Sequence, residues 1–292
     1  MPILSGVSGN ALASLSSIDK WVSTINASVS GAAKTGFKSN QVTFGGGTPQ
    51  LDKPATGGQL AIQFAEQSLS IASTSIDFTE GQVVASTEFS HLALSGDQKD
   101  FFVMSDKPST AEGTFATGTQ FFYTRDGEFH VNTNGQLVNK DGLYLVYMTQ
   151  NNKASTASLG TTTEDFETIV NAMIDRFNNP SGTATGPSFA INNVTNLQGL
   201  KYSKYGSTVF DTLDNNTTYN ALNTPTTTTT FLARSDTANA STKIAGSSLE
   251  ASNVQLPSSL VELSLAQKLY DALTKVIQID QQKIDSILNL IK

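Results

Sequence analysis

Few residues in this 292-residue chain are of types that could do chemistry, and their spacing does not favour it. Gly45-Gly46-Gly47 could cradle a phosphate, but neither the Lys-Ser/Thr pair nor the helix of a phosphate loop follows. A flexible linker is the better interpretation of this run. His91 and His130 lie in strand-like segments with no nucleophile motif beside them, which favours satisfied or exposed strand histidines.

Carboxylates are the other candidate group. Glu80, Glu88, Asp97 and Asp100 could bind a cation, but their spacing matches no EF-hand loop and favours a solvated surface. Trp21 lies in a helical pattern, where a packing or interface anchor is the better interpretation than a ligand platform. No set of nucleophile, base and orienting residue can be assembled, so we expect no catalytic residue, no metal and no cofactor.

The composition excludes several other classes. A net charge of −7 and a pI near 4.8, without clustered Lys or Arg, argue against binding to nucleic acid or to an anionic membrane. The absence of cysteine removes disulfides and thiolate sites. The first residues lack the pattern of a cleaved secretory signal, and no run of roughly 18 apolar residues predicts a membrane span or lipid insertion. The chain is therefore expected to be cytoplasmic, or exported by a route that reads another signal.

The elements that must position any site begin with two terminal helices. Residues 1–38 predict a helix running into a turn, with apolar residues three and four apart and a stop near Gly31 and Gly36. Residues 253–292 predict a second helix with two neighbouring apolar stripes, and Pro257 suits its first turn. From these patterns we assign axial helix packing to Val22, Ile25, Leu263, Tyr270, Ile277 and Ile284.

The middle of the chain has the texture of β structure. Residues 39–252 are rich in Thr, Ser, Asn and Gly, with short apolar runs between turn signals. Three Asx-Gly pairs between residues 120 and 146 predict a β-meander. Residues 150–245 resemble an inserted or appended subdomain with a short amphipathic helix over residues 164–177. The run Thr226–Thr230 predicts a solvated strand or loop.

Two apolar helices at opposite ends of a β-rich chain raise the question of what covers them. The first helix would extend roughly 40 Å and the second further, and the second is apolar on more than one face. A pair of terminal helices that packs against the same pair in neighbouring molecules would bury these stripes and yield a filament. The alternative is that both helices dock on the sheet of an ordinary globular protein. Periodicity alone leaves this choice open.

Sequence motifs at both ends and in the middle favour the first alternative. Lys34-Thr35-Gly36-Phe37-Lys38 resembles the T-G-F-K motif that closes the N-terminal helix of bacterial flagellar rod and hook proteins. The C-terminal segment is similar to the same family in G-x-L-E-x-S-N-V, at residues 246–254, and in A-Q-R-x-Y, at residues 266–270. Residues 76–81, 123–129 and 196–200 resemble its D-F-x-x-G, Y-T-R-D-G-x-F and N-x-x-G-L segments, in the family's order. Altered residues before T-G-F-K and around Gly96 mark a divergent member.

The resemblance implies a fold and a function. It implies an α+β fold in which the terminal helices pair as a coiled-coil inner domain beneath a mainly β, meander or barrel-like, outer region. The expected domains are an axial helix and turn at 1–38, a β-rich domain at 39–149, a subdomain at 150–245 and the second axial helix at 246–292. It assigns structural roles to its motif residues, which are Thr35, Gly36, Phe37, Lys38, Tyr123, Arg125, Gly127, Ser252, Asn253, Val254 and Gln267.

The function implied is that of a rod or hook subunit that polymerises into a tube, transmits torque and encloses an export channel. Its partners would be copies of itself, adjacent axial proteins and the flagellar export apparatus, and its place the basal body or hook, reached without a cleaved signal. The alternative from another class is a secreted binding module or adhesin that exposes the Thr-rich residues 185–245. A secreted hydrolase is the third and weakest, because no catalytic set is found.

Overall fold

The computed structural model describes residues 4–46, 50–53, 62–64, 68–111, 114–116, 118–149, 154–159, 163–179, 186–194, 196–212 and 242–290. The chain forms two compact units, and each is discontinuous in sequence. The helical unit comprises Met1–Ser30, Asn40–Asp77 and Val254–Lys292, and the β unit comprises Gly31–Ser39 and Phe78–Asn253. Each terminal helix thus belongs mainly to a unit that also contains a β-hairpin.

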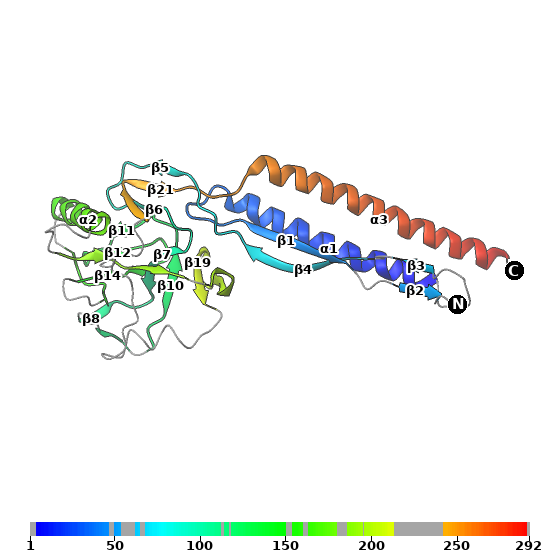
Figure 1. The fold of residues 1–292 in the computed structure, drawn as a ribbon, viewed down its shortest axis with the longest axis horizontal. Coiled ribbons are helices and arrows are strands. Elements are labelled where there is room, and N and C mark those ends of the chain that lie inside the picture. Colours follow the sequence, from blue (N-terminus) through cyan, green and yellow to red (C-terminus); the bar gives the residue numbers. More distant parts are fainter. Residues whose placement is uncertain are drawn as a thin grey trace. The chain divides into compact units, whose positions relative to one another are not determined.

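The helical unit consists of two long helices and a β ribbon (Figure 1). The helices are α1 (Leu4–Gly31) and α3 (Leu256–Leu290). Strands β1 (Asn40–Gly46) and β4 (Leu69–Ile76) form an antiparallel pair with a bulge between Thr43 and Phe44. A second antiparallel pair is made by β2 (Gln50–Lys53) and β3 (Ile62–Phe64).

The core of the helical unit forms where one face of α1 meets the ribbon and α3. Trp21 is 8% exposed and packs edge-to-face on Phe44 of β1, with ring centroids 5.0 Å apart. The Ser14 hydroxyl accepts a hydrogen bond from the Leu69 amide of β4 at 2.9 Å. Ile18, Trp21, Ile25 and Ala266 make the buried cluster, with Val22, Val29, Val42, Phe44, Leu69, Leu263 and Leu273 packed against it.

The β unit is built of short antiparallel strands (Figure 1). Its largest sheet has the order β11-β12-β13-β7-β10-β19-β18, with β17 also paired to β7. Its strands are β7 (Asp100–Ser105), β10 (Phe121–Thr124), β11 (His130–Val131), β12 (Leu137–Val138), β13 (Tyr144–Leu145), β17 (Ile191–Asn193), β18 (Leu200–Ser203) and β19 (Gly206–Thr212). A short 3₁₀ turn, Leu197–Gly199, precedes β18.

Smaller sheets complete the β unit. The order β15-β14-β16 makes a three-stranded sheet, while β5 pairs with β21, β6 with β20 and β8 with β9. Their bounds are β5 (Val83–Ala85), β6 (Leu92–Ser95), β8 (Ser109–Ala111), β9 (Thr114–Phe115), β14 (Tyr147–Met148), β15 (Ala154–Ser155), β16 (Ser188–Phe189), β20 (Lys243–Gly246) and β21 (Ser248–Glu250). The last two strands lie just before the C-terminal helix in sequence, so the β unit is completed late in the chain.

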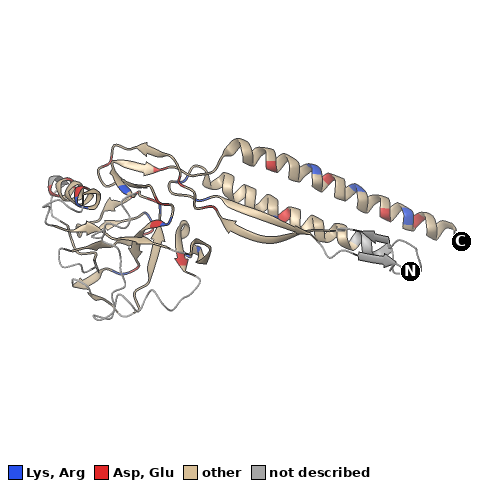
Figure 2. Cartoon of the chain, viewed as in Figure 1, with Lys and Arg blue, Asp and Glu red and all other residues tan. Residues whose placement is uncertain are grey.

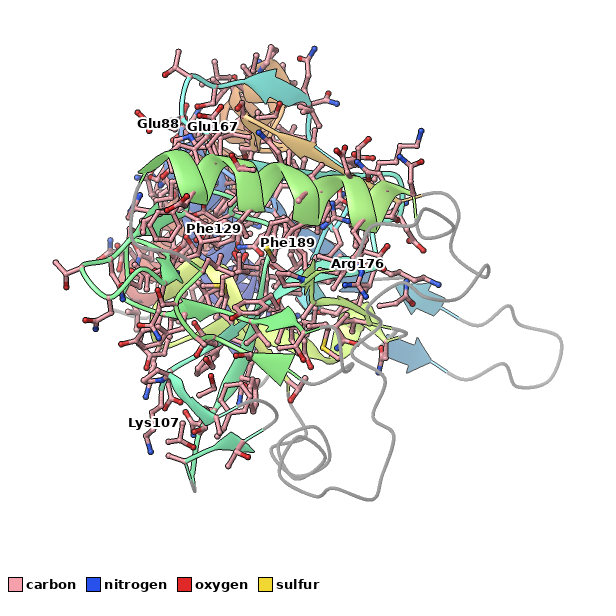
Figure 3. All side chains as sticks on the ribbon, turned by 90° about the vertical axis from the view of Figure 1, so that its left-hand side faces the viewer. Glu88, Lys107, Phe129, Glu167, Arg176 and Phe189 are labelled. Atoms are coloured by element: carbon pink, nitrogen blue, oxygen red, sulfur yellow. The ribbon has the colours of Figure 1, made fainter. Side chains whose placement is uncertain are left out.

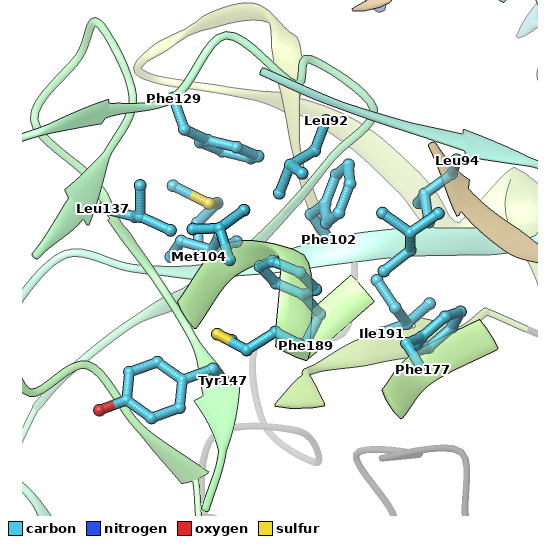
Figure 4. Close-up of a cluster of buried hydrophobic side chains, with 14 of the residues drawn as sticks. Leu92, Leu94, Phe102, Met104, Phe129, Leu137, Tyr147, Phe177, Phe189 and Ile191 are labelled. Atoms are coloured by element: carbon cyan, nitrogen blue, oxygen red, sulfur yellow. The ribbon is translucent and has the colours of Figure 1, made fainter. Parts of the chain in front are cut away.

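Helix α2 (Thr163–Asn178) covers the main core of the β unit (Figure 3). Its apolar residues Phe166, Val170, Met173, Ile174 and Phe177 are all buried, as the spacing predicts. The Asn178 side-chain amide both donates to and accepts from the backbone of Ile244 in β20, at 2.9 Å each. Beneath the helix, Phe102, Phe129, Phe189 and neighbouring aliphatic side chains form one close-packed cluster (Figure 4).

The predicted meander forms, with one difference. Strands β11, β12 and β13 pair in succession, and Gly135 and Gly142 in their turns have φ of 74° and 77°. The Asp126-Gly127 pair does not join two paired strands, because β10 pairs with β7 and β19 instead of β11. The α+β class is confirmed, but the described strands form open sheets and no closed barrel. Thr226–Thr230 lies outside the described residues.

The linker interpretation is wrong for Gly45 and Gly46. Both lie at the end of β1, paired with Ser70 and Leu69 of β4.

Candidate functional site: a buried motif cluster and an exposed helix face

Four of the motif segments come together inside the β unit. The motif cluster comprises Thr35–Lys38, Thr79–Gly81, Arg125–Gly127 and Glu250–Asn253, which are far apart in the sequence but joined by hydrogen bonds. The Gly36 amide donates to the Glu250 carbonyl at 2.7 Å, and the Asn253 amide donates to the Phe37 carbonyl at 3.4 Å. Gly36 has φ of 63°, and a Cβ there would overlap the backbone nitrogen of Asp126.

Asn253 and Phe37 make the hydrogen bonds and packing contacts at the edges of the motif cluster. The Asn253 side-chain oxygen accepts from the Ser39 amide at 2.8 Å, and its amide group donates to the Thr79 carbonyl and hydroxyl oxygens at 3.2 and 3.1 Å. Phe37 is 2% exposed, and its ring lies so close to Gly31 that a Cβ there would overlap it. Glycine at position 31 therefore leaves the space in which the Phe37 ring packs.

The centre of the motif cluster is a buried carboxylate between two buried cations. Glu250 is fully buried, and its Oε1 accepts from Lys38 Nζ at 2.6 Å and from the Gly81 amide at 2.8 Å. Its Oε2 accepts from Arg125 Nη1 at 3.2 Å. Lys38 Nζ also donates to the Thr79 carbonyl at 2.7 Å. These are short, charge-assisted hydrogen bonds in a region from which water is excluded.

Arg125 has additional hydrogen-bond partners in β6 and in the loop that follows it. Its guanidinium donates to the carbonyl oxygens of Leu94 and Asp97, and it lies 5.5 Å from the centroid of the Phe101 ring. Burial lowers the pKa of Lys38 from its ordinary value of 10.5, the Glu250 carboxylate opposes that change, and the Arg125 charge adds to it. Two buried cations, Lys38 and Arg125, thus contact the same carboxylate. The electrostatic balance at the centre of the motif cluster therefore depends on Glu250.

A second buried carboxylate, Asp126, ties the same motif to the meander. Its Oδ1 accepts from the Thr35 hydroxyl at 2.8 Å and from the Glu128 amide at 3.2 Å. Its Oδ2 accepts from Lys140 Nζ at 2.9 Å and from the Thr208 hydroxyl at 3.3 Å. Asp126 is 2% exposed, whereas the Lys140 side chain is 43% exposed. The ion pair is therefore half in water.

Replacing Lys140 by Met should reveal this pair through its pH dependence. Burial alone would lower the pKa of Lys140, but the hydrogen bond and charge of Asp126, with Glu128 and Asp141 nearby, raise it above 10.5. A raised folded-state pKa means that the stabilisation is complete below pH 10.5 and is lost as the pH rises through the folded pKa. We expect the variant to be less stable by about 1 kcal/mol at pH 8.

Urea unfolding of both proteins at pH 8 and pH 11.5, followed by circular dichroism, checks this prediction. The stability difference between wild type and Lys140→Met should shrink at the higher pH. A difference that does not change with pH would mean that Lys140 acts through packing of its aliphatic stem.

The second feature is the exposed face of α3, which lies in the helical unit. Within the described part of α3, only Ala266 and Asp280 are buried. Charged residues of both signs alternate with apolar ones along the helix (Figure 2). The exposed apolar face of α3 extends over more than one side of the helix and is made of Leu256, Leu260, Val261, Leu265, Leu269, Tyr270, Val276, Ile279, Ile284, Ile287, Leu288 and Leu290. Exposed apolar surface of this extent marks an interaction site.

The residues assigned to axial packing divide between the two sides of the helices. Ile25 is 4% exposed, and Val22 and Leu263 pack half-buried against the same cluster. Tyr270 and Ile284 are 42% and 38% exposed, and Ile277 is half-buried.

The residues assigned to motifs lie mostly inside the β unit. Thr35, Gly36, Phe37, Lys38, Arg125 and Asn253 belong to the motif cluster described above. Tyr123 is buried in β10, and Ser252 and Val254 are half-buried. Gln267 is exposed on α3.

Gly127 belongs to one of the three Asx-Gly pairs, in which glycine typically adopts positive φ in a hairpin turn. Its φ is not in that region. A Cβ at this position would instead overlap the Leu92 carbonyl oxygen of β6, so glycine is required by close backbone approach.

The histidine and carboxylate candidates take part in local structural contacts within the described residues. His91 Nδ1 and the Ser86 hydroxyl are 2.7 Å apart, a pair that the sequence did not suggest, and His91 is bridged through its backbone to Glu128. Asp97 and Asp100 both accept from the Asn193 amide group. In the described ranges no three His, Cys, Asp or Glu side chains are placed to hold a metal ion, and no helix is long and apolar enough to span a membrane.

Sequence reasoning missed the partners that complete the motif cluster. Glu250 was seen only as part of a motif, and Asp126, Lys140 and Thr208 had no assigned role. The signal that could have found Glu250 is charge complementarity, because two motifs each carry a cation and a third carries the carboxylate.

These two features are those of a structural protein: its buried charges are occupied by internal partners, and a long helix presents an apolar face. Comparison with known proteins identifies the family. Residues 112–170 match the family model described as the flagellar hook protein FlgE/F/G D1 domain, and residues 245–290 match the flagellar basal body rod FlgEFG protein C-terminal domain. The chain is 24% identical to the flagellar basal-body rod protein FlgG of Bacillus subtilis (strain 168) over 294 residues, covering 99% of this chain and 98% of that protein.

The chain therefore belongs to the flagellar rod and hook protein family and is a structural axial subunit of the flagellum. This family places it in the basal body or hook, and it is a family of structural proteins. The matched C-terminal domain contains Glu250, Asn253 and all of α3, so it includes part of the motif cluster and the whole exposed helix face.

Proposed function

We propose that this subunit polymerises through its helical unit into a helical tube that transmits torque and encloses the export channel. The observation that carries the proposal is the exposed apolar face of α3, which a single chain leaves in water. A helix with so little buried surface gains little stability from its own chain. Contact between α3 and neighbouring copies would bury this face, and a repeated contact that does not close produces a filament.

The pairing of α1 and α3 as a coiled coil is part of this proposal. Its support is the cluster of Ile18, Trp21 and Ile25 with Ala266, which joins the two helices at one level.

Among axial proteins, we propose a rod subunit, because the alignment with a rod protein runs from end to end of both chains. The proposed partners are copies of this chain, adjacent axial proteins and the flagellar export apparatus, with export that needs no cleaved signal. Binding to nucleic acid and insertion into lipid are not part of the proposal. The alternative of a binding module rests on the Thr-rich residues 185–245, of which 213–241 lie outside the described residues.

A two-chain experiment tests polymerisation. The full-length chain is compared with a β-unit chain in which residues 31–39 are joined to 78–253 by a short Gly-Ser linker. The linker suits the chain because Asn40 and Ile76 are paired neighbours at the base of the β1–β4 ribbon. Negative-stain microscopy should show tubes of uniform diameter for concentrated full-length protein, and discrete particles for the β-unit chain.

Two outcomes would count against the proposal. Full-length protein that stays monodisperse at high concentration, with both helices protected from protease, would show that one chain covers its own helices. Tubes formed by the β-unit chain would show that the helical unit is not the assembling part. Immunogold labelling along purified basal bodies then distinguishes rod from hook.

A further inference from the structure

The arrangement of the buried charges implies an order in which the β unit can close. Lys38 and Arg125 are 0% and 1% exposed, and Glu250 is the carboxylate in contact with both. Glu250 is separated from Lys38 by 212 positions and from Arg125 by 125 positions. A chain in which Glu250 has not yet docked would therefore have to bury two cations without the anion that balances them.

Glu250 docks only when the end of the β unit does. It is the last residue of β21, which pairs with β5, and the preceding β20 pairs with β6. On either side of it, the backbone amides of Gly36 and Ala251 donate to the carbonyls of Glu250 and Gln82 at 2.7 and 2.8 Å. The charge contacts and the strand pairing thus form in the same step.

We propose that Glu250 is a closing latch, which holds the Gly31–Ser39 segment on the β unit and lets the motif cluster lose its water only after the C-terminal strands have docked. The large sheet, which contains neither Glu250 nor Lys38, is the part that forms independently of the latch. The physical claim stands on the motif cluster alone. Its use, to keep an incompletely exported chain open, rests on the proposed function.

Glu80 provides the matched control. It is the other carboxylate whose charge acts on Lys38, and its Oε2 accepts from the Gly96 amide at 3.3 Å. In the described part of the chain it forms no hydrogen bond or ion pair with Lys38 or Arg125. Glu80→Gln removes the same charge and adds the same amide as Glu250→Gln. It should leave the latch closed.

The test is native-state hydrogen exchange of the full-length chain, measured by NMR at a concentration where it is monomeric. In Glu250→Gln, the Gly36 and Ala251 amides should exchange at least tenfold faster than in wild type. The Val103 amide of β7 should keep its wild-type rate, and Glu80→Gln should match wild type throughout. Unchanged exchange at Gly36 and Ala251, or equal acceleration at Val103, overturns the proposal.

A second variant covers the case in which Glu250→Gln does not fold. Adding Lys38→Met leaves Arg125 as the cation beside position 250, with the Leu94 and Asp97 carbonyls still accepting from it. The double variant should fold and recover most of the lost protection at Gly36. A double variant that is no better than Glu250→Gln overturns the latch, because the damage would then not come from unbalanced cations. Neither result depends on polymerisation, so the proposed function is tested separately.

Discussion

A chain carrying Val261→Gln, Leu265→Gln and Leu288→Gln is expected to remain folded as a monomer but to lose tube formation at concentrations where wild type assembles. These side chains are 70%, 51% and 55% exposed, so a single chain gains little from them. Gln is a good helix former, so α3 itself should be retained. If assembly buries each of them, its loss weakens the subunit contact by about 1 kcal/mol per residue.

The three losses together amount to about 3 kcal/mol, which corresponds to a rise of roughly a hundredfold in the concentration needed for assembly. Sedimentation of polymer as a function of total protein measures that concentration. The matched control changes exposed polar residues of the same helix to other polar residues. Its substitutions are Ser264→Asn, Lys268→Gln and Gln282→Ser. If the apolar variant assembles at the wild-type concentration, the exposed face of α3 is not the subunit contact.

Local chemistry explains which parts of this fold the sequence predicts well. The face of α2 follows from the spacing of Phe166, Val170 and Phe177, because a helix places those side chains on one side. The turns at Gly135 and Gly142 follow from Asx-Gly pairs, because glycine adopts the positive φ that such turns need. In each case the residues that determine the structure are within a few positions of one another.

Long-range contacts are what the sequence leaves open. The strand pattern of residues 40–46 is visible, but nothing local indicates that Phe44 packs on Trp21 of α1. The motif letters around Lys38, Arg125 and Glu250 are equally visible, but charged residues are usually solvated, so their mutual burial is not the default expectation. The motifs therefore indicated the protein family, but they did not indicate which contacts their residues make in the fold.

Gly127 illustrates the same limit, because its role comes from a strand that lies 35 positions earlier in the sequence. The Asp126-Gly127 pair looks like a hairpin turn, yet Gly127 does not have positive φ. Its backbone instead lies against Leu92 of β6, whose amide donates to the Gly127 carbonyl at 3.1 Å. Leu92 is fully buried, and β6 in turn pairs with β20. The requirement for glycine is one of space between two backbones.

Gly127→Ala is therefore expected to destabilise the β unit by about 4 kcal/mol, the upper end of single-substitution effects. Its Cβ would overlap the Leu92 carbonyl oxygen, which is backbone and cannot rotate away, so β6 must move from the sheet that holds β20. Gly142→Ala is the control: Gly142 has φ of 77° but open space around an added Cβ. Left-handed backbone alone should make that variant less stable by about 1–2 kcal/mol.

Urea unfolding of the β-unit chain, followed by circular dichroism, compares the two substitutions without interference from the helices. Wild-type β-unit chain gives the reference stability, and native-like spectra of Gly142→Ala would establish that alanine in a turn is tolerated. Equal losses for the two variants would show that β6 yields to the extra carbon. In that case the close approach of Leu92 would not explain why the Tyr-Thr-Arg-Asp-Gly segment ends in glycine.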